Sequence, residues 1–231
     1  MKKLMLVSAL VVLAVGLSAN ATIVLDDFMT TNPAGGWGII AATLGTPVTM
    51  SETGLSGVYG GTRDTSYTVY VSKTGASMDM GYGETAQNNG SSGWSKAALT
   101  YNSGGGAGGL GLDLMSGTKF SVDRVFDHMG NLKNTVFSIT LFDGVQTATV
   151  SKIWTTYLYS NVTVTEDFLF SSFLAQNAAL NLSSIDTITL YLETDKAGDY
   201  LLTGGLYTDA IPEPATIAIL SLGGLLLRRK K

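Results

Sequence analysis

The sequence contains no cysteine and a single histidine, His128. Without thiols no disulfide can stabilise the fold, so stability has to come from packing and backbone pairing. One histidine and no thiolate also exclude zinc and other soft-metal sites. A catalytic triad is not expected, because no Gly-x-Ser-x-Gly turn offers His128 a nucleophile. We expect no cofactor.

Basic residues are scarce outside the two ends of the chain. Six of the fourteen Lys and Arg residues lie at the termini: Lys2, Lys3, Arg228, Arg229, Lys230 and Lys231. Between them, eight basic residues face seventeen acidic ones once Glu213 is set aside, so the body carries a net charge near −9. This charge argues against nucleic acid or an anionic membrane surface as a partner.

The amino-terminal segment has the three parts of a secretory signal peptide. Met1, Lys2 and Lys3 are followed by an apolar run over 4–17 and by Ala19-Asn20-Ala21, a small-x-small site. This order predicts export and cleavage by signal peptidase after Ala21. An uncleaved membrane helix is the alternative.

The carboxyl-terminal segment reads as a second membrane signal. Pro212-Glu213-Pro214 cannot be helical, and it precedes an uncharged run over 215–227 and a basic end. As a helix this run would span about 20 Å, against about 30 Å of bilayer hydrocarbon, so it predicts a marginal anchor. The basic end would remain cytoplasmic, which places the body outside.

This segment resembles the PEP-CTERM sorting signal of bacterial exported proteins. The resemblance rests on Pro212, Glu213 and Pro214, the apolar stretch, and the tail with Arg228 and Arg229. The two final lysines depart from the family, whose tail is mostly arginine. The resemblance implies recognition by a membrane-embedded exosortase that cleaves near the tripeptide. An ordinary tail anchor is the alternative, with the same topology and no cleavage.

Together these signals predict three parts: a signal peptide over 1–21, an extracytoplasmic domain over 22–210 and a sorting segment over 211–231. The itinerary is export, transient anchoring in the inner membrane with the carboxyl terminus cytoplasmic, and then the cell surface or extracellular space. Both terminal apolar segments are expected to be helices standing off a β-rich body.

Alternation of apolar and polar residues with period two recurs through the body and predicts strands. The expected strands are 22–28, 48–51, 66–71, 76–80, 96–101, 110–114, 118–122, 135–142, 145–150, 155–165, 187–192 and 200–207. Asp143-Gly144 predicts a hairpin, and 168–179 is either a helical turn or a further strand. The Gly-rich stretches 83–93 and 102–109 are expected to be loops. The fold class is therefore all-β, an antiparallel two-sheet sandwich, jelly-roll-like.

The body also resembles exported sandwich domains and jelly rolls of the carbohydrate-binding type. The pieces that carry the resemblance are Val24-Leu25-Asp26-Asp27-Phe28, Gly60-Gly61-Thr62-Arg63-Asp64 and the stretch 182–190. This resemblance implies only a fold, because a fold does not by itself specify a function.

The acidic residues suggest two kinds of site, a catalytic pair and a calcium site. Glycoside hydrolysis needs a pair of them, and the candidates are Glu52, Glu84, Glu166 and Glu193, although solvated turn residues are the simpler interpretation of the last two. A structural calcium ion is the second hypothesis, with Asp26, Asp27, Asp64 and Asp199 as weak candidates. The neighbours Arg63 and Asp64 are expected to tie a loop to its sheet.

Three tryptophans could offer flat surfaces on which sugar rings stack. Trp94, in an expected loop over 91–95, is expected to be the exposed one and is the candidate for glycan contact, whereas Trp37 and Trp154 are expected to fill the core.

The leading hypothesis is a noncatalytic exported surface or extracellular-matrix protein that is sorted by exosortase and binds exopolysaccharide. The alternatives are a structural envelope protein that associates with itself and, third, a glycan-active enzyme.

Overall fold

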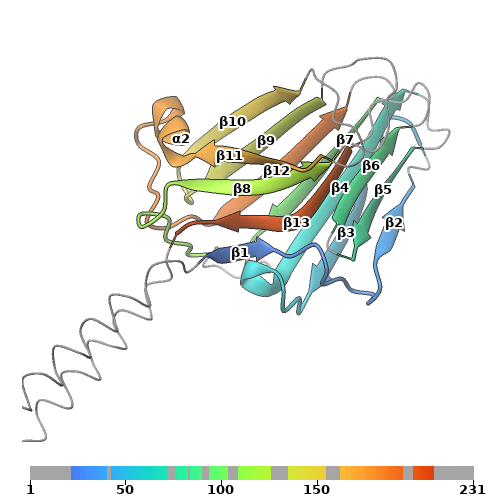
Figure 1. Ribbon diagram of the computed structural model, residues 1–231, viewed down its shortest axis with the longest axis horizontal. Helices are drawn as coiled ribbons and strands as arrows, with labels where there is room; N and C mark the ends of the chain where they lie inside the picture. The colour runs from blue at the N-terminus through green and yellow to red at the C-terminus, as the bar shows by residue number, and fades with distance from the viewer. Residues whose placement is uncertain are drawn as a thin grey trace, which may run out of the picture.

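The fold is an antiparallel sandwich of two β-sheets, as the alternation predicts. The computed structural model describes residues 22–40, 43–71, 76–82, 84–89, 94–103, 109–125, 135–154, 162–194 and 200–210. Figure 1 shows the sheets stacked face to face, with one short helix at the end of the sandwich beside β10 and β11.

The seven-stranded sheet has the order β11-β8-β13-β6-β5-β2, and β1 pairs with β13 beside this path. Its strands are β1 (Ile23–Asp26), β2 (Trp37–Ile39), β5 (Ala76–Gly81), β6 (Glu84–Asn89), β8 (Lys119–Val125), β11 (Val164–Leu169) and β13 (Tyr200–Thr208).

The six-stranded sheet has the order β10-β9-β12-β7-β4-β3. Its strands are β3 (Val48–Thr53), β4 (Thr62–Val71), β7 (Trp94–Tyr101), β9 (Thr135–Phe142), β10 (Thr147–Trp154) and β12 (Thr187–Thr194). A 3₁₀ turn, η1 (Tyr59–Gly61), leads into β4.

The core lies between the inner faces of the two sheets. Leu99, Ile139 and Leu190 are fully buried on the six-stranded sheet, and Phe120 and Val122 on the seven-stranded one. The sheets also meet through an edge-to-face aromatic pair, since the ring centroids of Phe137 on β9 and Phe168 on β11 lie 5.0 Å apart. Such a pair adds about 0.5–1.5 kcal/mol to the area it buries.

The stretch 168–179 contains both structures that the sequence left open. It finishes β11 and then forms helix α2 (Phe170–Gln176). Phe170 and Phe173, one turn apart, bury their rings against Phe120. The helix ends at Asn177, whose backbone N–H donates to the carbonyl of Phe173.

Two loop or strand expectations were wrong. Residues 83–93 were expected to be a loop, but Glu84–Asn89 is strand β6, which pairs with β5 on one side and β13 on the other. Residues 110–114 were expected to be a strand, but they form only an isolated bridge between Leu112 and Ile185. The predicted hairpin is confirmed: Phe142 pairs with Thr147, and residues 143–146 make the turn.

Both terminal segments lie outside the described residues. This covers the signal-peptidase residues Ala19 and Ala21 and the sorting residues Pro212, Glu213, Pro214, Arg228 and Arg229. Within the described ranges, no helix is long and apolar enough to cross a membrane.

Candidate functional site

The outer face of the six-stranded sheet is lined with hydroxyl groups. Because side chains alternate between faces, the strands that bury leucine and isoleucine inward present their other residues outward. Their register sets serine and threonine side by side in rows across neighbouring strands, and three pairs are hydrogen-bonded: Thr140 with Thr149 at 2.8 Å, Ser138 with Ser151 at 3.0 Å and Thr100 with Thr189 at 3.3 Å.

A pocket of about 340 Å³ lies on this face. That volume is within the usual range for small-molecule sites. Four strands contribute its lining, which consists of Lys96 from β7, Val136, Ser138 and Thr140 from β9, Thr149 from β10, and Tyr191 and Glu193 from β12.

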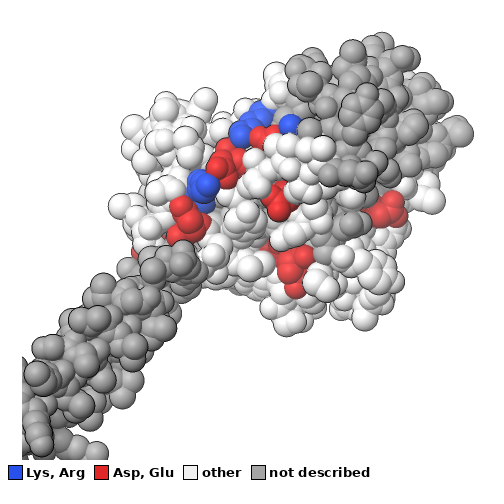
Figure 2. All heavy atoms as spheres, in the orientation of Figure 1, with Lys and Arg blue, Asp and Glu red and all other residues white. Residues whose placement is uncertain are grey.

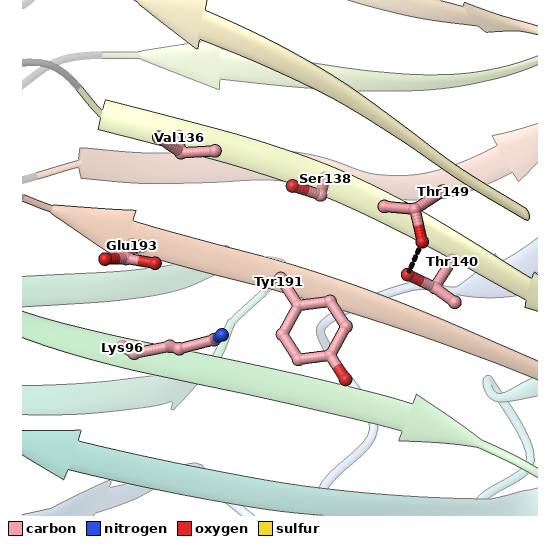
Figure 3. Close-up of a pocket in the computed structure, with 7 residues that line it drawn as sticks. All are labelled: Lys96, Val136, Ser138, Thr140, Thr149, Tyr191 and Glu193. Carbon is pink, nitrogen blue, oxygen red and sulfur yellow. Dashed lines mark hydrogen bonds between the residues drawn. The ribbon is translucent and has the colours of Figure 1, made fainter. Parts of the chain in front are cut away.

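Tyr191 is the aromatic wall of the pocket. It lies on β12, so the hydroxyl-bearing strands β9 and β10 are on one side of it and β7 is on the other. Figure 3 shows Ser138, Thr140 and Thr149 on the first side and Lys96 on the second. The Lys96 ammonium lies 4.8 Å from the centre of the Tyr191 ring, a cation–π contact.

Glu193 is the carboxylate of the pocket, and Trp94 orients it. The Trp94 indole Nε1 donates to Glu193 Oε1 at 3.1 Å. The Trp94 ring itself is half-buried, with its centroid 4.6 Å from that of Tyr70 on β4. The expected glycan-contact residue therefore opens β7 beside the pocket and holds one of its lining groups.

The calcium candidates are not gathered into one site. Asp26 faces inward, Asp27 accepts from the backbone N–H of Met29 and Thr30 within its own turn, and Asp64 accepts from the Asn102 side chain at 3.1 Å. Asp199 lies outside the described residues. Among the residues that the structure describes, no group of three or more histidines and acids is placed to hold a metal ion.

Asp26 instead belongs to a buried ion cluster with Arg63 and Glu52. Arg63 Nη1 lies 2.7 Å from Asp26 Oδ2, and Arg63 Nη2 lies 2.7 Å from Glu52 Oε2. Arg63, on β4, also donates to the Thr30 carbonyl at 3.0 Å. It therefore ties the loop that follows β1 to the six-stranded sheet, as expected. Burial raises the pKa of Asp26, and the charge of Arg63, which two carboxylates share, only partly opposes the rise.

A second ion cluster joins the two sheets at their other edge. Glu166 on β11 accepts from Arg124 on β8 at 2.6 Å and from Lys152 on β10 at 2.8 Å. Burial disfavours the charged form of Glu166, but the hydrogen bonds from Lys152 and Arg124 outweigh burial and keep its pKa below the ordinary value. Figure 2 shows acidic and basic atoms adjoining one another on this side of the molecule.

The remaining sequence candidates fall in different places. Trp37 on β2 packs partly buried against the core, in line with the expected core-filling role. His128 and the side chain of Trp154 lie outside the described part of the chain. The sequence did not single out Tyr191 or Lys96, because only the β12–β7 pairing brings them together.

Neither a protein-family model nor a curated protein sequence matches the chain. Distant similarities exist to solved structures of carbohydrate-binding modules. The Family 11 Carbohydrate-Binding Module of cellulosomal cellulase Lic26A-Cel5E of Clostridium thermocellum is 18% identical, with a TM-score of 0.38 over 84% of this chain and 97% of that one. The CBM22-1 xylan-binding domain from Paenibacillus barcinonensis Xyn10C is 13% identical, with a TM-score of 0.36 over 84% and 99%.

Proposed function

We propose that the chain is a noncatalytic exported protein that binds polysaccharide on the outer face of its six-stranded sheet. The observation that carries this proposal is the pocket in which a tyrosine ring adjoins hydroxyl groups of neighbouring strands. A sugar ring has an apolar C–H face, which packs on an aromatic ring, and hydroxyls around its rim, which hydrogen-bond to serine, threonine and carboxylate oxygens.

The carboxylate content of this pocket supports binding rather than glycoside hydrolysis. Hydrolysis usually requires two carboxyl groups facing the same bond. Glu193 is the one carboxylate in the lining of this pocket. Glu52 and Glu166 are held by buried cations in the two ion clusters, and the side chain of Glu84 lies outside the described part.

The terminal sequences support export. The signal-peptide pattern that ends at Ala21 and the resemblance of 211–231 to a sorting signal together imply processing by signal peptidase and an exosortase. On this proposal the protein is anchored briefly in the inner membrane and then resides at the cell surface or in the extracellular matrix.

Pulldown of the purified chain on exopolysaccharide from the same cells tests the binding. Tyr191→Ala removes the aromatic wall and should weaken retention about tenfold or more, which corresponds to about 1.4 kcal/mol. Tyr82→Asn is the control. Tyr82 is 82% exposed and follows β5, a strand of the other sheet, and asparagine tolerates its positive φ of 56°.

The control variant should bind like the wild type. Equal retention of wild type and Tyr191→Ala would contradict the assignment of the pocket. An absence of retention, together with self-association of the purified chain as its concentration rises, would favour the structural alternative instead.

Mass spectrometry of the protein from native cells tests the export proposal. The mature chain should begin at Thr22 and end near the Pro212–Pro214 tripeptide. Intact chain recovered from the cytosol would contradict export, and a mature chain that retains Lys231 would contradict exosortase cleavage.

A further inference from the structure

Four of the five cations that the structure describes are paired with carboxylates. Arg63 pairs with Asp26 and Glu52, Lys119 pairs with Asp167 at 2.7 Å, and Arg124 and Lys152 share Glu166. Lys96 is the exception, because no carboxylate of a described residue lies within 4.0 Å of its ammonium group. The exception is also the cation that lines the pocket.

The carboxylate that could neutralise Lys96 is engaged elsewhere. Glu193 lies directly opposite Lys96 in the β12–β7 register. Its carboxylate nevertheless accepts from the Trp94 indole, and the Lys96 ammonium lies over the Tyr191 ring instead. A half-buried contact with an aromatic ring is a weak substitute for a carboxylate, so the ammonium can exchange it for an anion that enters the pocket.

We propose that the pocket takes a sugar unit that carries a single negative charge, the carboxylate of a uronate, and that Lys96 pairs with this carboxylate. The inference rests on the proposed polysaccharide function. Glu193 and the hydroxyls of Ser138 and Thr140 then remain for the sugar hydroxyls. A doubly charged phosphate fits less well, because Glu193 would repel it more strongly than a single charge.

Among the cations that the structure describes, this one side chain is the source of the expected preference for an anion. The body as a whole is acidic, with eight basic residues against seventeen acidic ones, so its overall field repels polyanions. On the opposite sheet, Lys119 is already matched to Asp167. Loss of the Lys96 charge should therefore weaken the binding of charged sugars more than that of uncharged sugars and so remove the preference.

Matched pairs of polymers provide the test. Polygalacturonate, polymannuronate and polyglucuronate are each compared with their methyl esters, which keep the backbone and remove the charge. Dissociation constants are measured by affinity electrophoresis or calorimetry for the intact chain, Lys96→Met, Lys96→Arg and the control Lys119→Met. Thermal unfolding confirms that each variant is folded.

We expect the wild type to bind at least one uronate polymer about fivefold or more tightly than its ester. Lys96→Met should lower the affinity for the acid polymer more than that for its ester and bring this ratio close to one, whereas Lys96→Arg and Lys119→Met should retain the ratio. An ester that binds as well as its acid, or a preference that survives Lys96→Met, would overturn the inference.

Two further arms separate the remaining outcomes. Dextran sulfate and dextran form the first: retention of the sulfated polymer that depends on Lys96, with no retention of uronates, would show that the carboxylate assignment is wrong. A panel of neutral glucans and xylans forms the second. Binding of these polymers alone would overturn the uronate inference and leave the proposed function standing, whereas no binding to any polymer would overturn both.

Discussion

Replacing Arg63 with methionine tests how far the buried ion cluster stabilises the sandwich. The guanidinium and both carboxylates are fully buried, and the contacts to Asp26 and Glu52 are each 2.7 Å long. Methionine occupies much of the same space but leaves both carboxylates without a cation. Since removing one partner from a buried ion pair costs about 3–5 kcal/mol, we expect a comparable fall in the free energy of unfolding. A domain usually has only about 5–15 kcal/mol to lose.

Urea unfolding of the intact chain at neutral pH, followed by tryptophan fluorescence, measures this change. The free energy of unfolding falls with urea concentration by about 1–3 kcal/mol per molar. With a value near the upper end of that range, the urea concentration at the unfolding midpoint should fall by roughly 1–2 M. Lys119→Met is the control, because Lys119 and Asp167 are 35% and 41% exposed. Exposed pairs contribute about 0–1 kcal/mol, so equal shifts in the two variants would refute the reasoning.

A combined variant separates lost charge compensation from lost packing. Adding Asp26→Asn and Glu52→Gln to Arg63→Met removes both uncompensated charges and should recover part of the stability. No recovery would assign the loss to packing. The pH dependence gives an independent check: burial raises the pKa of Asp26 against the charge of Arg63, and the rise should grow when that charge is removed. The folded state then holds more protons than the unfolded chain, so Arg63→Met should become less stable as the pH rises from about 4.

Two other predictions concern the second ion cluster and a crowded glycine. The lowered pKa of Glu166 means that its contribution is present above the pKa of the unfolded chain and is lost as the pH falls through the folded value, so Glu166→Gln should flatten the loss of stability between about pH 5 and 3 in urea titrations. Gly205→Ala should lower the unfolding midpoint far more than Gly54→Ala. Both glycines have positive φ, +90° and +72°, but an added Cβ would lie 2.5 Å from the Asp26 carbonyl oxygen at Gly205 and would meet nothing within 4 Å at Gly54. The strain common to both sites costs about 1–2 kcal/mol, and similar midpoints for the two variants would contradict the predicted clash.

The strands that alternate clearly could be predicted, and those that depend on their neighbours could not. Thr135–Phe142 and Thr187–Thr194 form the middle of a sheet with one buried face, so their pattern is visible in the sequence. Glu84–Asn89 consists almost entirely of polar residues and becomes a strand because β5 and β13 supply pairing partners on both sides. Leu112 and Leu114 alternate for another reason, since both are buried without belonging to a strand.

The site was only partly predictable, because some of its residues are recognisable from the local sequence and others meet only through strand pairing. Trp94 could be singled out by its residue type and polar surroundings, and the structure places it beside the pocket. Lys96 and Tyr191 are 95 positions apart and meet only through the register of β12 against β7, which no local pattern encodes. Asp26 was expected as a calcium candidate, whereas its partner is Arg63, whose burial the local sequence does not reveal.

The pairing of β1 with β13 has a consequence for how the domain can be held. Ile23 and Thr208 are direct cross-strand partners, so the chain enters and leaves the domain about one strand spacing apart, roughly 5 Å. A tether at either terminus would therefore suspend the domain from the same pole. Trimming one tether and retaining the other would therefore leave the point of attachment unchanged. The pocket, which belongs to the other sheet, would keep its orientation toward the surroundings.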